Sequence, residues 1–330
     1  MMWTRGVLVR LSVGALLAMS WALCAQADEP SGSSPKWLEL AQAQPAPADG
    51  AKAAPVAAPA DAPAKWEKPI PLTVGVSYVL VSDYIFRGIN FSEYAREGRE
   101  KPNHQMTVFA EYDTGKFGTI GASVWFEWFA AQQQLTPAYG GNNQEIDYTI
   151  YYRYAFDTIG LTAETGWIAY TFPPFGRDAH TDYEWYGKLS FDDAKVFGTS
   201  VLNPYIAYYH DLDLAKNSSW WEIGISHGFA LADYGMKDTP VLKDITVTPS
   251  LILGAQHRYF GKLGLANSPS TKLANLNYGL EVAYDLGAAL GLPEQYGSLG
   301  VAGFLNFSQA LDDTVLNDEF YGGMKVSYSW

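Results

Sequence analysis

From Leu72 to the C-terminus, apolar side chains recur at every second residue, in stretches separated by turn residues. Because successive side chains of a β-strand point to opposite sides, this rhythm predicts strands with one apolar and one polar face. In the last stretch, one face carries Met324, Val326, Tyr328 and Trp330, and the other carries Lys325, Ser327 and Ser329. The same rule puts Ala274 on the apolar face of its stretch, together with Leu276. The only unbroken apolar run lies near the N-terminus, which excludes a helical membrane protein with segments of about 20 apolar residues.

The alternation continues through twelve segments, which we expect to be strands. Their predicted bounds are 72–88, 104–113, 118–131, 145–156, 160–171, 181–192, 200–211, 219–230, 244–258, 273–286, 297–309 and 319–330. Tight turns follow some of these strands and longer polar loops follow others, which predicts an up-and-down sheet with both termini on the same side. Pro249 lies inside the ninth segment and Pro204 lies near the start of the seventh. Since proline cannot donate to a strand ladder, we expect a bulge or a shifted boundary at Pro249.

Aromatic residues gather near both ends of the apolar face, with smaller apolar residues between them. The expected aromatic girdle consists of Tyr112, Trp128, Tyr148, Tyr154, Trp167, Tyr183, Phe191, Tyr208, Trp221, Phe229, Tyr284 and Trp330. Two aromatic belts around an aliphatic band match a bilayer with two wet interfaces. In hydrocarbon, an open sheet would leave edge N–H and C=O groups unpaired, so the strands must close. The expected fold class is therefore all-β, a transmembrane antiparallel up-and-down β-barrel of about 12 strands, and a soluble antiparallel β-protein is the alternative.

The polar face of such a barrel surrounds its lumen. The charged candidates to line the lumen are Asp83, Arg87, Glu111, Glu127, Asp147, Arg153, Glu164, Asp182, Glu184, Lys188, Glu222, Arg258, Glu281 and Lys325. Nine of these residues are acidic and five are basic, so a mildly acidic lumen with weak cation preference is expected. Twelve strands should leave at most a narrow path for ions and small solutes. The alternative is a lumen plugged by pairs of opposite charges, in a barrel with a structural or surface-recognition role.

Asp83 and Arg87 stand four residues apart in the first predicted strand. This spacing places them on the same face and about 13 Å apart along the strand. A direct bond between them is therefore not expected. We expect both to be structural residues of the lumen before they are selectivity residues.

The N-terminal 69 residues have a different composition from the rest of the chain. Residues 1–27 carry Arg5, Arg10, an apolar run of 13 residues and the sequence Ala25-Gln26-Ala27, which predict a secretory signal peptide. Residues 28–69 are rich in alanine and proline and are expected to form a flexible periplasmic linker, followed by the barrel at residues 70–330. Export and a lipid-facing barrel together predict location in the outer membrane of a Gram-negative bacterium. The net charge of −13 makes nucleic acid an unsuitable partner.

The residues with catalytic potential do not combine into a recognisable site. In His210-Asp211 and Ser226-His227, the two side chains point to opposite faces of a strand, so neither can be a nucleophile and base pair. His104, His180, His210 and His257 fall near one predicted rim, but a belt of amphipathic rings accounts for them as well as a metal site does. We therefore expect a protein that is not an enzyme, with no cofactor and no bound metal, and an outer-membrane barrel enzyme is the least favoured alternative.

The residues Ser77-Tyr78-Val79-Leu80-Val81-Ser82-Asp83-Tyr84-Ile85-Phe86-Arg87-Gly88 resemble the N-terminal signature of the TorF-type porins, a family of bacterial outer-membrane barrels. The terminal Trp330 is similar to the C-terminal aromatic residue that the barrel assembly machinery reads. The resemblance implies a membrane pore and no catalytic residues. The expected partners are outer-membrane lipids and lipopolysaccharide, the assembly machinery at the C-terminal strand, and small solutes.

Overall fold

The computed structural model describes residues 68–92, 102–129, 144–172, 181–266 and 270–330. The expected signal peptide at 1–27 and nearly all of the expected linker at 28–69 lie outside these ranges. None of the helices within the described ranges has the length and apolar character needed to cross a bilayer.

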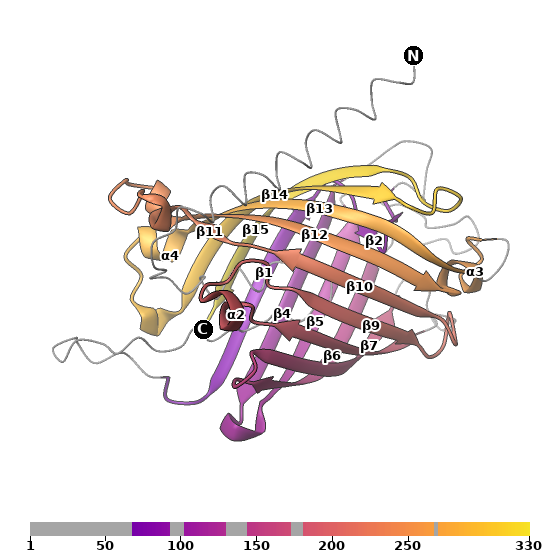
Figure 1. Cartoon of the computed structure of the whole chain (residues 1–330), viewed down its shortest axis with the longest axis horizontal. Helices are drawn as coiled ribbons and strands as arrows, with labels where there is room; N and C mark the ends of the chain where they lie inside the picture. Colours follow the sequence, from indigo (N-terminus) through magenta and orange to yellow (C-terminus); the bar gives the residue numbers. More distant parts are fainter. Residues whose placement is uncertain (1–67, 93–101, 130–143, 173–180, 267–269) are drawn as a thin grey trace, which may run out of the picture.

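Twelve long strands form a closed antiparallel ring (Figure 1). They are β1 (Leu72–Val81), β4 (Asn103–Asp113), β5 (Thr119–Phe129), β6 (Gln144–Phe156), β7 (Leu161–Thr171), β8 (Asp182–Phe191), β9 (Tyr205–Asp211), β10 (Ser219–Ser226), β12 (Ile245–His257), β13 (Thr271–Asp285), β14 (Ser298–Ala310) and β15 (Glu319–Ser329). Each strand pairs with its neighbours in the chain, and the pairing of β1 with β15 closes the ring. The expected antiparallel barrel of twelve strands is confirmed.

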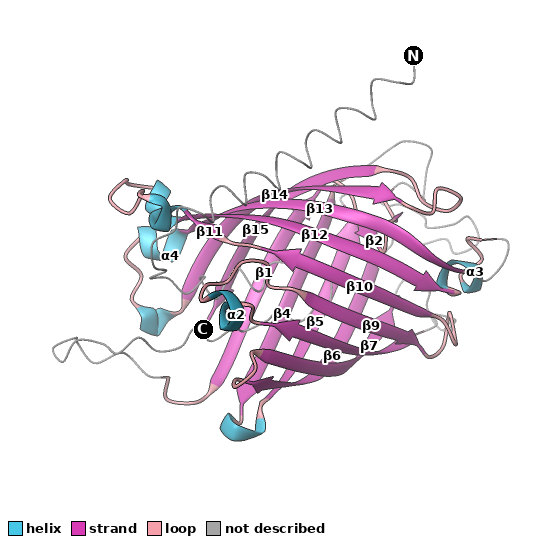
Figure 2. Cartoon of the chain, viewed as in Figure 1, coloured by secondary structure: helices cyan, strands magenta, loops and turns pink. Residues whose placement is uncertain are grey.

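Short helices occur only at the ends of the barrel in the described part of the chain (Figure 2). One end holds α2 (Ala194–Phe197), α4 (Leu286–Ala289) and the C-terminus, together with the 3-10 turns η2 (Gly115–Phe117), η4 (Leu231–Tyr234), η5 (Leu242–Asp244) and η6 (Glu294–Tyr296). The opposite end holds α3 (Tyr259–Lys262). Both ends of the barrel sheet, Leu72 and Ser329, lie at the first end, as the pattern of turns and loops predicts.

The first strand is shorter than expected. The prediction extended it to residue 88, but β1 ends at Val81. Residues that follow form a separate hairpin of β2 (Ile85–Phe86) and β3 (Ile89–Asn90). Tyr84, Ile85 and Ile89 of this segment are buried. The expectation that Asp83 and Arg87 share one strand face is therefore wrong, because the chain turns away from the wall before it reaches them.

Pro249 is accommodated differently from the prediction. It lies inside β12, paired with Leu280, and the strand on its other side is interrupted instead. That strand breaks between β10 and the two-residue β11 (Phe229–Ala230), and the His227 amide donates to the Pro249 carbonyl at 3.2 Å. The neighbouring strand is thus interrupted beside Pro249, which has no backbone N–H group to donate to it. Pro204 directly precedes β9, since the predicted strand 200–211 starts only at Tyr205.

Side-chain exposure follows the two-residue rhythm along the last strand. Met324 and Val326 are exposed on the outside, whereas Lys325, Ser327 and Ser329 are buried inside. The rule fails at Ala274, which is fully buried while Leu273 is 52% exposed. The register of β12 and β13 shifts here, because Gly254 pairs with Asn275 and Ala255 pairs with Leu273. This bulge reverses the alternation on its N-terminal side, so the predicted apolar position of Ala274 is wrong.

The interior is filled by large aromatic rings that lie over glycines of the adjoining strand. Phe109 lies opposite Gly75, Tyr186 opposite Gly166, and Tyr205 opposite Gly224 in the strand register. In each pair, a Cβ atom added to the glycine would meet the ring of its partner. A glycine therefore makes room for a ring to lie flat against the barrel wall. Rings of this kind narrow the lumen.

Candidate pore interior

Most of the predicted lumen residues lie on the inner face of the barrel. Those carried by strands and buried or half-buried there are Glu111, Glu127, Asp147, Arg153, Glu164, Asp182, Glu184, Lys188, Glu222, Glu281 and Lys325. Asp83 and Arg87 are 5% exposed in the segment that folds into the barrel. Arg258 lies just beyond β12, with a φ of 63°, at the start of α3. The alternation of inward and outward side chains along each strand correctly predicts where these charges lie. The exceptions are Asp83, Arg87 and Arg258, which lie beyond the end of a strand.

Arg87 and Glu184 form a bidentate ion pair inside the barrel. The two guanidinium nitrogens of Arg87 donate to the two carboxylate oxygens of Glu184 at 2.7 and 2.8 Å. The Tyr170 hydroxyl donates to the same carboxylate at 2.6 Å. The guanidinium also lies over the rings of Phe86, Tyr209, Trp220 and Tyr259, at 4.7 to 5.5 Å from their centroids. Charge-assisted bidentate bonds and ring faces of this kind satisfy a buried guanidinium on all sides.

A second ionic network lies on β4, β6, β7 and β8. Arg153 donates to Glu111 at 2.9 Å and to Glu164 at 2.8 Å. The hydroxyls of Tyr151 and Tyr186 donate to Glu111 and Glu164, respectively, at 2.6 and 2.7 Å. One arginine thus bridges two carboxylates, and each carboxylate has a tyrosine donor as well.

A third ion pair connects β13 and β15 across the intervening β14. The Lys325 ammonium donates to Glu281 at 2.6 Å. Elsewhere in the lumen, the ammonium of Lys188 lies 4.5 Å from the ring centroid of Tyr205. The basic side chains inside the barrel are thus engaged by acids or by ring faces.

Several acidic side chains of the interior have polar neighbours but no ion pair of their own among the described contacts. Glu145 accepts a hydrogen bond from the Tyr84 hydroxyl at 3.1 Å, and Glu127 accepts one from Asn103 at 2.5 Å. Glu222 accepts one from the Trp220 indole at 3.1 Å. The inner face therefore carries more carboxyl groups than basic side chains.

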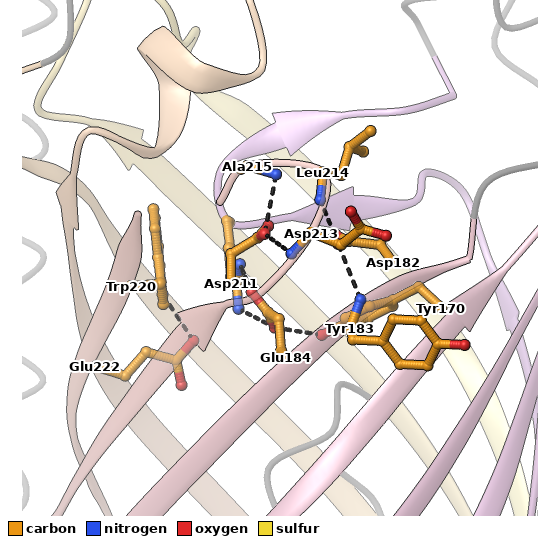
Figure 3. A network of polar contacts seen from close by, with 11 residues as sticks. Tyr170, Asp182, Tyr183, Glu184, Asp211, Asp213, Leu214, Ala215, Trp220 and Glu222 are labelled. Atoms are coloured by element: carbon orange, nitrogen blue, oxygen red, sulfur yellow. Dashed lines mark hydrogen bonds and ion pairs between the residues drawn. The ribbon is translucent and has the colours of Figure 1, made fainter. Parts of the chain in front are cut away.

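Two acidic residues hold the turn between β9 and β10 at the end of the barrel opposite the C-terminus (Figure 3). Asp211 accepts hydrogen bonds from the amides of Asp213 and Ala215 at 3.0 and 2.9 Å. Asp182 accepts one from the Leu214 amide at 2.9 Å. Both carboxylates therefore have a structural role in this turn. The alternation along the strand predicted only that Asp182 faces the lumen.

The sequence reasoning missed Glu145 and Asp211 as inner-face acids. Glu145 has the same parity as Asp147 in β6, and Asp211 has the same parity as the buried Tyr209 in β9. The alternation could therefore have identified both. What it could not supply is their partners, because those come from other strands.

A cavity of about 200 Å³ lies beside residues 82–92, the segment that follows β1 and folds into the barrel, which we call the inward segment. Its polar lining includes Ser250 of β12, Asn277 of β13 and Asn306 of β14, together with Asp83 and Glu222. Neutral hydroxyl and amide groups with a few carboxylates can replace part of the hydration of a cation or a small polar solute.

The predicted girdle residues lie mainly on the outer face. Tyr112, Tyr148, Trp167, Tyr183 and Trp221 are each 42% or more exposed there. Trp128, Tyr154, Phe191, Tyr208, Tyr284 and Trp330 are half-buried. Phe229 differs, because it is 8% exposed and packs against His227 and Tyr234. It lies in β11, just after the break in the strand that runs beside Pro249, and the regular alternation of inward and outward side chains is lost there.

The histidines of the predicted rim have separate neighbours. His104 stacks on Trp128, His210 stacks on Tyr208, and His257 bonds to Thr271, while His180 lies outside the described residues. Within the described ranges, no three His, Cys, Asp or Glu side chains are grouped to hold a metal ion. At the opposite end, burial lowers the pKa of His227, while the Val201 backbone and Asp193 act in the other direction.

No family model and none of the curated proteins matches the chain, so membership of the TorF-type porins stays a prediction. Among solved structures, the chain is similar to the NanC porin, with 14% identity, a TM-score of 0.41, and 77% of this chain and 98% of that chain covered. The KdgM porin is similar at 11% identity and a TM-score of 0.41, with coverage of 78% and 99%. The outer membrane phospholipase A from Escherichia coli is similar at 12% identity and a TM-score of 0.38, with coverage of 78% and 92%. At such low identities and scores, the function has to be argued from the geometry of this barrel.

Proposed function

We propose that this protein is an outer-membrane porin that allows ions and small solutes to diffuse passively through a narrow, mildly acidic lumen. The observation that carries the proposal is a closed barrel with an apolar outside and, inside it, a cavity of about 200 Å³ whose lining includes neutral polar and acidic side chains. Diffusion needs no catalytic groups, and the polar lining has the neutral and acidic character that small hydrated cations require.

Membrane insertion is supported by the exposed apolar residues of the outer face. Val108, Ile150 and Ile223 are 44% to 59% exposed in the middle of their strands. An apolar surface of this extent is unfavourable in water, whereas lipid can cover it. Because the barrel is closed, no strand edge is left unpaired in the lipid. Outer-membrane lipids and lipopolysaccharide are therefore the proposed surroundings, and the C-terminal strand β15 is the segment proposed to be read by the assembly machinery.

Cation preference is supported by the surplus of carboxylates in the lumen. Arg87, Arg153 and Lys325 are paired with carboxylates, and the cavity lining holds two further carboxylates, Asp83 and Glu222. A confined negative potential lowers the energy of cations and raises that of anions.

Single-channel recordings of the refolded barrel in planar bilayers test the proposal. Small, ion-permeable steps are expected, and a reversal potential under a salt gradient should show cation preference. Glu222→Gln should weaken that preference, whereas Glu294→Gln, at an exposed position in η6, should leave it unchanged. Correctly folded protein without conductance would contradict a pore, and anion preference would contradict the acidic lumen.

The second candidate is a structural or surface-recognition barrel with a plugged lumen. It is favoured by the ion pairs and by buried rings such as Tyr186 and Trp220, which occupy much of the interior. This candidate expects no conductance from wild-type protein that migrates on gels as a heat-modifiable, intact barrel.

A further inference from the structure

We infer that the inward segment of residues 82–92 is the constriction of the barrel, and that the Arg87–Glu184 ion pair is the latch that holds it. The inference rests on the proposed channel function and names the element that sets the width of the path. It starts from the point where β1 ends at Val81 and the chain enters the lumen.

The segment reverses direction at Arg87 and Gly88. Phe86 pairs with Ile89, and the two residues between them have φ values of 53° and 81°. Positive φ at both central residues is the pattern of a type I′ turn, which joins the strands of tight hairpins. Glycine adopts this conformation readily, but arginine does not. An unfavourable backbone conformation persists where surrounding contacts hold it, and Arg87 is the residue with such contacts.

The contacts of the segment lie on opposite walls of the barrel. Arg87 binds Glu184 on β8, whereas the side-chain amide of Asn90 donates to Glu319 on β15 at 3.2 Å. Counted around the ring of twelve long strands, β8 and β15 are six places apart. Six of twelve places is half of the circumference. The segment therefore reaches across the whole lumen and does not lie along one wall.

Further contacts fix the segment at other points. The Tyr84 hydroxyl bonds to Glu145 of β6, and Ile89 packs in one cluster with Leu316 from the loop between β14 and β15. At Gly88, an added Cβ would lie 2.7 Å from the Leu316 side chain. The Arg87 contact is the strongest of these anchors, because its two hydrogen bonds join opposite charges.

The cavity of about 200 Å³ is lined by this segment, through Arg87 and Gly88, and by residues of several strands of the barrel wall. The wall residues include Asn277, Asn306 and Tyr321. Release of the latch would allow the segment to leave its place across the lumen. The space it occupies would then join the cavity, and the path would become wider.

Conductance of two single variants tests the latch and separates it from a plain effect of charge. Arg87→Ala and Glu184→Gln both break the ion pair, so both should raise single-channel conductance for KCl by about twofold or more. An effect of charge alone would have opposite signs in a cation-preferring lumen. Loss of the arginine would raise cation conductance, and loss of the glutamate charge would lower it.

Two further variants control for folding and for lumen charge. Arg153→Gln removes a lumen arginine whose partners are Glu111 and Glu164 and not residues of the segment, so it measures the effect of lost positive charge alone, and Arg87→Ala should raise conductance by more than Arg153→Gln does. Replacement of residues 85–90 by two glycines removes the constriction and should raise conductance even if a point variant folds poorly. Heat-modifiable migration on gels identifies intact barrels before each recording.

Hydrogen exchange in detergent supplies a readout that does not depend on conduction. In Arg87→Ala, amides of residues 84–91 should exchange faster, while those of β4 to β7 stay protected. If amides of the segment exchange faster in Arg87→Ala but neither the wild-type nor the variant barrel conducts, the result would support the latch and contradict the proposed pore. Unchanged or lower conductance in intact Arg87→Ala and Glu184→Gln channels, when wild-type barrels do conduct, would overturn the inference. Unchanged exchange in both variants would also overturn it.

Discussion

Tyr186 lies over Gly166, its direct partner on the adjoining strand, with the tyrosine ring against bare backbone. A Cβ atom at residue 166 would be 2.7 Å from Cε1 of this ring. The ring is fully buried, and its hydroxyl donates to Glu164 at 2.7 Å. The glycine is therefore needed to bring the hydroxyl to the carboxylate that Arg153 also binds.

Gly166→Ala should lower the free energy of unfolding by about 1–3 kcal/mol, because the added methyl would lie 2.5 Å from the Ile150 carbonyl oxygen and 2.7 Å from the Tyr186 ring. Equilibrium unfolding in urea, with the protein in lipid vesicles, measures the change. Gly187→Ala is the matched control, since a Cβ there would meet nothing closer than 3.7 Å. Equal stability of the two variants would contradict the close packing of Tyr186 on Gly166.

The Lys325–Glu281 ion pair should respond unequally to loss of its two members. The side chain of Lys325 is 1% exposed, whereas that of Glu281 is 15% exposed. Glu281→Ala leaves a buried ammonium without its partner and should cost about 3–5 kcal/mol of unfolding free energy. Lys325→Met leaves a carboxylate nearer to the cavity and should cost less.

A double-mutant cycle that combines Glu281→Ala with Lys325→Met measures the coupling between the two side chains. The double variant should be more stable than the Glu281→Ala variant, since no unpaired ammonium remains. Additive effects of the two changes would argue against the ion pair.

A charge introduced on the outer face should destabilise the barrel in the middle of a strand and have little effect at the barrel end. Ile150 is 59% exposed in β6, and Ile159 is 57% exposed in the turn before β7. Ile150→Arg should destabilise the barrel in vesicles by about 2–4 kcal/mol, and Ile159→Arg by about 0–1 kcal/mol. Similar effects at both positions would show that the middle of the outer face does not contact lipid hydrocarbon.

Asp312 should stabilise the loop between β14 and β15 only above acidic pH. Burial raises the pKa of this carboxyl, but hydrogen bonds from Thr314 and Lys272 outweigh burial and hold the pKa below its ordinary value. A carboxyl with a lowered folded-state pKa stabilises above its unfolded pKa, and the contribution disappears as pH falls through the folded value.

Urea unfolding from pH 6 to pH 3 checks the behaviour of Asp312. The stability difference between the wild type and Asp312→Asn should be largest at pH 6 and should shrink below about pH 4. Asp313→Asn, at an exposed neighbouring position, should show no such trend. A difference that is constant with pH would mean that the charge of Asp312 does not act on the folded loop.

The inward and outward faces were largely predictable, and the exceptions have local causes. Lys325 and Met324 were assigned to the correct faces by counting residues from a turn. Ala274 was not, because a bulge inserts one residue that no composition signal marks. Arg87 was misplaced for a related reason, since the end of β1 follows from contacts inside the lumen and not from the local pattern.

The sequence by itself determined the barrel, because each strand must show one apolar and one polar face, and this two-residue rhythm is a local property of the chain. It also determined that acids outnumber bases inside, since parity assigns each charge to a face. Tertiary structure alone decided which charges meet. Arg87 and Glu184 are 97 residues apart, and their pairing depends on closure of the ring and on a hairpin that crosses it. Interactions between distant segments have no local periodicity, so only the folded chain reveals them.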